Sequence, residues 1–266
     1  MPPLPNLAET RIAEAVRALR QPGFEAALAG LFHAVAAPDN LIYLAYRDAG
    51  PPQVLYRQTL DPTVFAELQS TYLPGAYRLD PYFDLHLNRV AAGAYRLIDI
   101  APDAFHRSRY FREYYEQTTL LDEITFVAYP APGVTVNLCL GRDATSGRVF
   151  SQGQLDTCQR LAPIVAALID SHWADLARAT GPAQDTAVLL AEALRRTHDI
   201  ALSPRQAEVA LLILQGHSTM SIGLRLGLSP QTVKVFRKQL YARCTLSSQA
   251  ELFALMLPLL RDQGSG

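Results

Sequence analysis

Apolar residues in the first 177 positions follow two different spacings along the chain. A spacing of three to four residues predicts helices, and alternation of apolar and polar residues predicts strands. In chain order the pattern predicts helices at 6–20 and 22–37, strands at 41–47 and 53–60, a helix at 62–73, a strand at 94–100, a helix at 107–118, a hairpin of strands at 123–130 and 134–141, and a long helix at 152–177. A sheet with helices before, within and after it follows from this order, so we predict an N-terminal α/β sandwich.

The pattern changes after residue 177. Gly181 and Pro182 form a break that is typical of a linker. Beyond it the apolar residues keep helical spacing, and they predict four helices over 203–261 with no strand. The fold class is therefore α+β with two domains. The predicted division is an α/β domain at 1–177, a linker at 178–198 and an all-α domain at 199–262.

Two of the four predicted helices form a recognisable motif. Ser218 or Thr219 begins a short helix, and Gly227 opens a tight turn before Ser229 caps the next helix. A short helix, a turn that contains glycine and a second helix rich in basic residues are the parts of a helix-turn-helix. The sequence predicts this motif at about 219–238.

The second helix of the motif carries Lys234 and Lys238, the only two lysines of the chain. Their spacing of four residues places both on one helical face. No acidic residue lies between Glu208 and Glu251, although the whole chain has a net charge of −1. A positive face without nearby counter-charges attracts polyanions, and lysine can donate to guanine or to phosphates in a major groove. We therefore expect this face to bind duplex DNA.

The stretch LSPRQAEVALLILQGHSTMSIGLRLGLSPQTVKVFRKQLYARC, which begins at Leu202, resembles the DNA-binding domain of LuxR-type transcriptional regulators. The resemblance implies that side chains of the second motif helix reach base edges and phosphates. The implied contacts are Lys234, Val235 and Lys238 at base edges, Thr232 and Arg237 near phosphates, and Gln231 beside them.

The same resemblance extends to the last predicted helix. It implies that Leu252, Leu255 and Met256 contribute to a homodimer, whose operator would have approximate two-fold symmetry. RNA polymerase is a further candidate partner. The chain departs from the family pattern at Gly223, where the family usually has alanine. Glycine inside a helix costs up to about 1 kcal/mol relative to alanine, but it permits the close helix approach that the motif requires.

The domain before the linker contains no lysine, which excludes two common input domains. A phosphoryl-accepting receiver needs a lysine beside its aspartates, and a P-loop needs Gly-Lys-Ser/Thr. Tyrosine is concentrated there instead, with eight copies within 72–129. Phenols offer apolar walls and an orienting hydroxyl to a small ligand, although any one of them could be a core residue. The predicted ligand-binding residues are Tyr72, Tyr77, Asp80, Tyr82, Tyr110 and Tyr114.

The stretch that ends in Asp80-Pro81 resembles part of the autoinducer-binding domain of acyl-homoserine-lactone receptors. That resemblance implies that Asp80 bonds the amide of a ligand. Glu67 stands where those receptors have a tryptophan. Residues 107–126 resemble a GAF-like sensor of solo regulators. We therefore predict a sensor for another small molecule, with a lactone receptor as the alternative.

Other chemistry is not indicated by the sequence. Three cysteines and six histidines show no spacing typical of a disulfide framework or a metal site, and no GxSxG motif is present. No catalytic residue, cofactor or metal is predicted. Without a signal peptide pattern or an apolar run of about 20 residues, the chain is predicted to be a cytoplasmic regulator. An enzyme, and a module that forms inactive heterodimers with another regulator, stay open as alternatives.

Overall fold

The computed structural model describes residue 4 and residues 7–48, 50–176 and 185–261. The chain folds into two compact units that are not continuous in sequence. Unit 1 comprises Met1–Val64, Leu85–Ile100 and Thr119–Gly181, and unit 2 comprises Phe65–Asp84, Ala101–Thr118 and Pro182–Gly266. Two segments from the N-terminal half therefore share a unit with the C-terminal helices. In the described ranges, no helix is long and apolar enough to cross a membrane.

Unit 1 is built on a five-stranded antiparallel sheet with the order β2-β1-β5-β4-β3. The strands are β1 (Asn40–Arg47), β2 (Gln53–Thr59), β3 (Gly93–Arg96), β4 (Leu120–Ala131) and β5 (Val134–Asp143). The helices are α1 (Ala8–Arg17), α2 (Phe24–Val35), α4 (Leu97–Ile100) and α6 (Gln152–His172). Two short helices, η1 (Pro62–Phe65) and α3 (Pro81–Leu87), cross the boundaries between the units.

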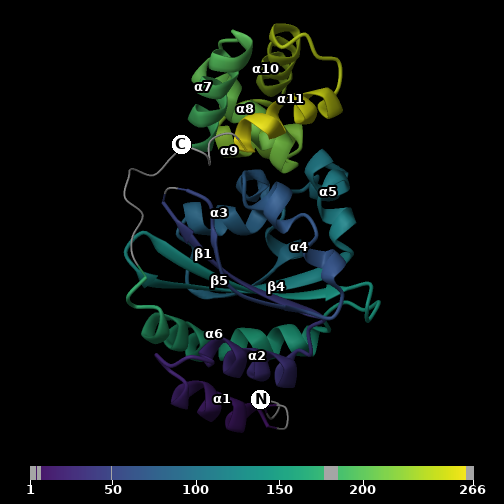
Figure 1. Cartoon of the computed structure of the whole chain (residues 1–266). Coiled ribbons are helices and arrows are strands. Elements are labelled where there is room, and N and C mark those ends of the chain that lie inside the picture. The colour runs from purple at the N-terminus through teal and green to yellow at the C-terminus, as the bar shows by residue number, and fades with distance from the viewer. Residues whose placement is uncertain (1–3, 5–6, 49, 177–184, 262–266) are drawn as a thin grey trace. The chain divides into compact units, whose positions relative to one another are not determined.

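Helices α2 and α6 lie along one face of the sheet, and α1 packs on α2 (Figure 1). The core between them is aromatic and aliphatic, and it includes Phe32, Tyr43 and Phe126. The rings of Phe32 and Phe126 are 5.0 Å apart, which is a favourable aromatic spacing. Trp173, at the end of α6, packs edge-on against Phe24. Burial of this face gives the sheet its stability, because one face of an antiparallel sheet must pack on a core.

The described part of unit 2 contains five longer helices and several short helical elements. The longer helices are α7 (Thr186–His198), α8 (Pro204–Gln215), α9 (Thr219–Leu226), α10 (Pro230–Arg243) and α11 (Gln249–Arg261). The short elements are η2 (Leu68–Tyr72), η3 (Ala76–Leu79), η4 (Phe105–Arg107), α5 (Arg109–Glu113) and η5 (Tyr115–Thr118). Helix α8 packs against α7, α9 and α10, and both α8 and α11 also contact α5 and η3.

The predicted fold class is confirmed, because a sheet flanked by helices is joined to a separate helical part. The predicted hairpin is confirmed as β4 and β5, and the four helices predicted over 203–261 are α8 to α11. Part of the predicted linker is helix α7, whereas residues 178–184 lie outside the described residues. The division into a sensor domain, a linker and a DNA-binding domain stays a prediction.

Three local predictions were wrong. The helix predicted at 62–73 is a 3-10 turn followed by a single π-turn, in which the backbone N–H of Tyr72 donates to the Glu67 carbonyl. The strand predicted at 94–100 ends at Arg96 and continues as the one-turn helix α4. The helix predicted at 107–118 is broken into α5 and η5. Local periodicity indicates which residues share a face, but it does not fix where a run of backbone hydrogen bonds ends.

Candidate nucleic-acid interface and ligand cluster

Helices α9 and α10 form the predicted helix-turn-helix. The Ser218 hydroxyl accepts the backbone N–H of Ser221 at 3.2 Å and caps α9. Gly227 ends α9 in the left-handed conformation with φ 65°, where glycine carries no steric penalty. The Ser229 hydroxyl then accepts the backbone N–H of Thr232 at 3.0 Å and caps α10, which has Pro230 in its first turn. The caps fix the turn between the two helices, because they satisfy N–H groups that a helix leaves unpaired.

Gly223 lets the turn approach α9 closely. Its carbonyl accepts the backbone N–H of Leu228 at 2.8 Å. A methyl group at Gly223 would lie 2.7 Å from the Leu228 carbonyl oxygen, closer than packed atoms tolerate. The sequence-based expectation that this glycine serves close helix approach is therefore confirmed.

Helix α10 divides into a buried face and an exposed face. Val233 and Leu240 are fully buried and hold α10 against the neighbouring helices. Lys234 and Lys238 are exposed on the other face, and their ammonium groups have no ion pair or hydrogen bond with the described residues. Val235 lies beside them with 47% of its surface exposed. This is the arrangement of a helix face that is free to enter a groove of DNA.

Two of the other three residues predicted to contact DNA are less exposed than the lysines. Gln231 is exposed, whereas Thr232 and Arg237 are half-buried. The Thr232 hydroxyl lies 2.7 Å from the Ser229 hydroxyl, so it takes part in the cap of α10. The Arg237 guanidinium lies over the Tyr241 ring at 5.4 Å and donates to its hydroxyl at 3.3 Å. Arg237 is therefore held in place by a cation–π contact at the edge of the exposed face.

The six predicted ligand-binding residues lie together in unit 2, although they come from two separate segments. The rings of Tyr110 and Tyr114 are stacked at 5.4 Å, and Tyr72 stacks on Tyr114 at 5.6 Å. Tyr77 meets Tyr72 edge-on at 6.5 Å. All are buried, as are Asp80 and Tyr82. Asp80 joins these rings through the Tyr72 hydroxyl, and the backbone N–H of Tyr82 bonds to Asp80. We call the set of predicted residues the tyrosine cluster (Tyr72, Tyr77, Asp80, Tyr82, Tyr110 and Tyr114).

Asp80 is the charged group of the tyrosine cluster. Its carboxylate accepts the Tyr72 hydroxyl at 2.9 Å and the Tyr82 backbone N–H at 2.8 Å. Burial raises the pKa of the Asp80 carboxyl to about 6, whereas these two hydrogen bonds oppose the rise. Asp84 adds to the rise, because like charges disfavour ionisation. A buried carboxyl with such a pKa is typical of a functional position.

Polar contacts join the segments of the tyrosine cluster to the C-terminal helices. The Gln215 side chain donates to the Asp84 carboxylate at 3.2 Å, and the Ala104 backbone N–H donates to the Gly216 carbonyl at 3.1 Å. The Asp103 carboxylate accepts the Ser218 backbone N–H, at the start of α9, at 2.9 Å. An anion is favourable at a helix N-terminus. No local pattern in the sequence predicts these contacts.

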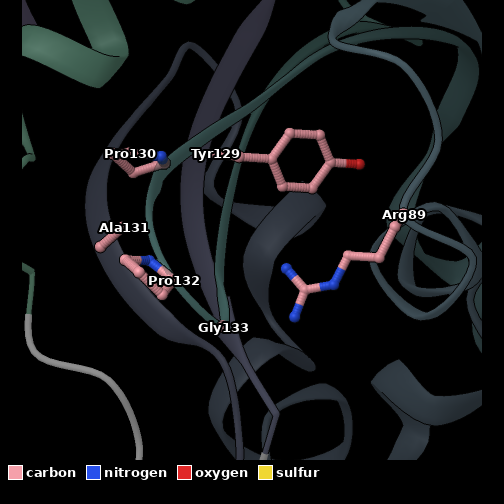
Figure 2. A pocket seen from close by; sticks show the side chains of 6 residues that line it. All are labelled: Arg89, Tyr129, Pro130, Ala131, Pro132 and Gly133. Atoms are coloured by element: carbon pink, nitrogen blue, oxygen red, sulfur yellow. The ribbon is translucent and has the colours of Figure 1, made fainter.

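A separate hollow lies in unit 1 at the turn between β4 and β5, with a volume of about 430 Å³ (Figure 2). Arg89, Tyr129 and the turn residues 130–133 line it. The Arg89 guanidinium donates to Asp48 at 2.7 Å, and the Tyr129 hydroxyl donates to the Val90 carbonyl at 2.6 Å. Both polar groups thus have partners within unit 1, and we assign no ligand to this hollow. No group of three His, Cys, Asp or Glu in the described part of the chain could hold a metal ion.

Comparison with known proteins places these features in a family. Residues 201–256 match the family described as "Bacterial regulatory proteins, luxR family". The chain is also 30% identical over 185 residues to a protein of Aeromonas salmonicida whose name describes an HTH-type transcriptional regulator in the exeN 3′ region. That match covers 67% of this chain and 93% of the relative. The chain belongs to the LuxR family. It is accordingly a DNA-binding transcriptional regulator.

One solved structure extends the likeness of this LuxR-family chain beyond the helix-turn-helix. The VqsR LBD domain from Pseudomonas aeruginosa is 25% identical, with a TM-score of 0.52, and the match covers 63% of this chain and 96% of that one. Escherichia coli SdiA is 14% identical, with a TM-score of 0.42, over 95% of this chain and 97% of that one. The VqsR match supports a signal-sensing domain before the LuxR-type DNA-binding part.

Two of the three residues predicted to form a dimer in this LuxR-family chain are buried within the single chain. Leu252 and Met256 have no exposed surface within the single chain. Leu255 is half-buried and is the member of the set that retains accessible surface. Leu252 and Met256 are therefore core residues of unit 2 in this arrangement. A role in dimerisation stays a prediction for all three.

Proposed function

We propose that this regulator binds operator DNA as a homodimer through the exposed face of α10. Lys234, Val235 and Lys238 contact base edges, and Thr232 and Arg237 lie near phosphates with Gln231 beside them. The observation that carries the proposal is that both lysines are exposed and have no protein partner among the described residues. Their charges remain available to phosphates and guanines, which supply affinity and sequence preference respectively.

The signal in this proposal is a small molecule that binds at the tyrosine cluster. Five phenol rings and one carboxylate combine large apolar surfaces with a few polar groups, which is the composition of small-molecule sites. Asp80 is the polar anchor. The likeness to the VqsR LBD domain supports a sensing role. A lactone receptor stays the alternative, because the Asp80-Pro81 pair resembles that group.

The signal reaches the DNA-binding helices within unit 2. Asp84 and Asp103 come from the segments that carry the tyrosine cluster, and they bond to Gln215 and to the first turn of α9. A ligand that moves these segments changes those hydrogen bonds directly. By linkage, the ligand and the operator then alter each other's affinity. The regulator acts in the cytoplasm, with RNA polymerase as a further partner.

The DNA part of the proposal is tested with operator fragments selected by the purified full chain from a random duplex pool. Replacing Lys238 with Ala is expected to weaken binding to the selected duplexes by about 1 to 3 kcal/mol and to relax the sequence preference of the protein. Equally weakened binding to unrelated duplexes would show that Lys238 contacts only phosphate. Unchanged binding to both would refute the proposed interface.

The ligand part is tested by mass spectrometry of small molecules that copurify with the full chain. Tyr77→Phe and Asp80→Asn should lose the copurified molecule or bind it more weakly, while both variants keep their affinity for the selected duplex. Leu60, which is 69% exposed, supplies a control as Leu60→Gln. Retention of the molecule by both cluster variants would show that these residues are core rather than ligand contacts.

A further inference from the structure

Two carboxylates from the N-terminal half of the chain contact α9, the first helix of the helix-turn-helix. They belong to segments 65–84 and 101–118 of unit 2, which we call the sensor segments. The Asp103 carboxylate accepts the Ser218 backbone N–H at the start of α9, at 2.9 Å. The Asp84 carboxylate lies 3.8 Å from the Arg225 guanidinium, near the end of α9. The sensor segments therefore place one acid at each end of this helix.

Backbone contacts hold the second sensor segment against the start of α9. The Ala104 backbone N–H donates to the Gly216 carbonyl at 3.1 Å. Gly216 has a φ of 96°, and a Cβ atom there would lie 2.9 Å from the Cα atom of Phe105. Glycine avoids both the strained φ and the steric clash. The position of Asp103 is thus fixed by main-chain contacts of the residues that follow it.

The pKa values of both carboxyls respond to the groups that they contact. Burial raises the pKa of Asp84, whereas the Arg225 charge and the Gln215 hydrogen bond oppose the rise. Burial also acts to raise the pKa of Asp103, but its hydrogen bonds, chiefly those with Ser218, outweigh burial and lower the pKa. Asp103 is therefore ionised at neutral pH, and its charge lies at the helix end that favours an anion.

A helix-turn-helix brings its first helix close to DNA phosphates, because that helix crosses the backbone while the second helix lies in the major groove. Arg225 is the only charged residue of α9. Its side chain is 46% exposed, and a guanidinium is a favourable partner for phosphate. A carboxylate at the same helix repels phosphate and competes with it for the arginine. The two acids of the sensor segments therefore oppose the approach of the DNA backbone to α9.

We propose that Asp84 and Asp103 restrain DNA binding, and that Arg225 becomes a further phosphate contact when they move away. The inference rests on the proposed function and gives its signal a direction, because a ligand that moves the sensor segments away from α9 raises operator affinity. By linkage, the operator then strengthens ligand binding by the same factor. Lys234 and Lys238 of α10 stay exposed beside the docked segments. The restrained chain therefore still binds DNA, but more weakly.

Binding of a selected duplex by the full chain, measured over a range of salt concentrations, tests the restraint. The variant Asp84→Asn with Asp103→Asn should bind the duplex about tenfold more tightly than the wild type, which is the effect of two partly exposed charge contacts. Its log–log salt slope should steepen by about 1, because Arg225 then neutralises one more phosphate. Adding Arg225→Ala should return the slope to the wild-type value, which a loss of structure alone would not do.

The matched control is Glu116→Gln with Glu192→Gln, which removes two negative charges from exposed positions of η5 and α7 in unit 2. It should gain much less affinity than the aspartate variant and keep the wild-type slope. An equal gain in the control would reduce the effect to net charge and overturn the proposal. Wild-type affinity and slope in the aspartate variant would also overturn it. If that result came with weakened binding by Lys238→Ala, the proposed DNA interface would stand and this restraint alone would be refuted.

Hydrogen exchange of the wild type gives a second measurement, which does not depend on the folding of a variant. The Ala104 amide bonds to the Gly216 carbonyl at the contact with α9. This amide should exchange faster when the selected duplex is bound, because DNA displaces the second sensor segment. Exchange that stays the same or slows on DNA binding would show that the contact persists in the complex, and it would overturn the proposal.

Discussion

Gly75, just before η3, lies against the backbone of α11, and Gly75→Ala should disrupt this contact. A Cβ atom at this position would lie 2.6 Å from the carbonyl carbon and oxygen of Leu260 and 2.7 Å from the backbone nitrogen of Arg261. These are backbone atoms of a helix, so they cannot move aside as a flexible side chain does. The φ of Gly75 is −179°, which alanine adopts readily. The whole effect is therefore steric.

Overpacking of this kind costs about 1 to 3 kcal/mol. At a urea slope of about 2 kcal/mol per molar, a loss of 2 kcal/mol lowers the unfolding midpoint by about 1 M. Hydrogen exchange should also accelerate at the backbone amides of α11, because its C-terminal turn must shift away from Gly75. Urea unfolding and native-state exchange of the full chain measure both effects.

Gly153→Ala is the matched control, because a Cβ there meets nothing within 4 Å and the residue lies in the first turn of α6. We expect it to be neutral or slightly stabilising, as alanine favours helices over glycine. If Gly75→Ala has the same urea midpoint as the wild type, and the backbone amides of α11 exchange at the wild-type rate, the described contact between η3 and α11 is wrong.

Three further predictions follow from single contacts. Because the folded pKa of Asp80 is raised to about 6, the native chain holds this proton more tightly between about pH 4 and 6. Protonation of Asp80 should therefore raise the free energy of unfolding by up to about 3 kcal/mol as the pH falls through that window. Urea titrations of Asp80→Asn should not show this increase. Burial lowers the pKa of His217 to about 4, so the contribution of His217 to stability should fall from pH 6.5 towards 4, and His217→Gln should lack that loss. Ser229→Ala removes the α10 cap and should cost about 1 kcal/mol of stability in thermal unfolding.

Local sequence rules were sufficient for the helix-turn-helix. Ser218, Gly227 and Ser229 act at the positions that capping rules predict, and the spacing of Lys234 and Lys238 places them on one face. Each of these features depends on residues within about four positions of one another. The turn between β4 and β5 was predictable for the same reason.

The joining of two N-terminal segments to the C-terminal helices could not be predicted. Gln215 and Asp84 are 131 positions apart, and Ser218 and Asp103 are 115 apart. Neither pair has a spacing, cap or periodicity that indicates its partner. The tyrosines of the cluster were predicted from their concentration in the sequence, and Asp80 from the resemblance to lactone receptors. Local periodicity did not predict that α5 ends at Glu113.

The central claim is that the lysine face of α10 binds DNA, and the salt dependence of operator affinity tests it most directly. The variant Lys234→Ala with Lys238→Ala is compared with Arg195→Ala and Arg196→Ala, which remove the same charge from exposed positions of α7. The lysine variant should lose about 100-fold in affinity for a selected duplex, and its log–log salt slope should fall by as much as about 2. The α7 variant should keep nearly all of its affinity. Equal losses in the two variants, or wild-type affinity in the lysine variant, would contradict the account.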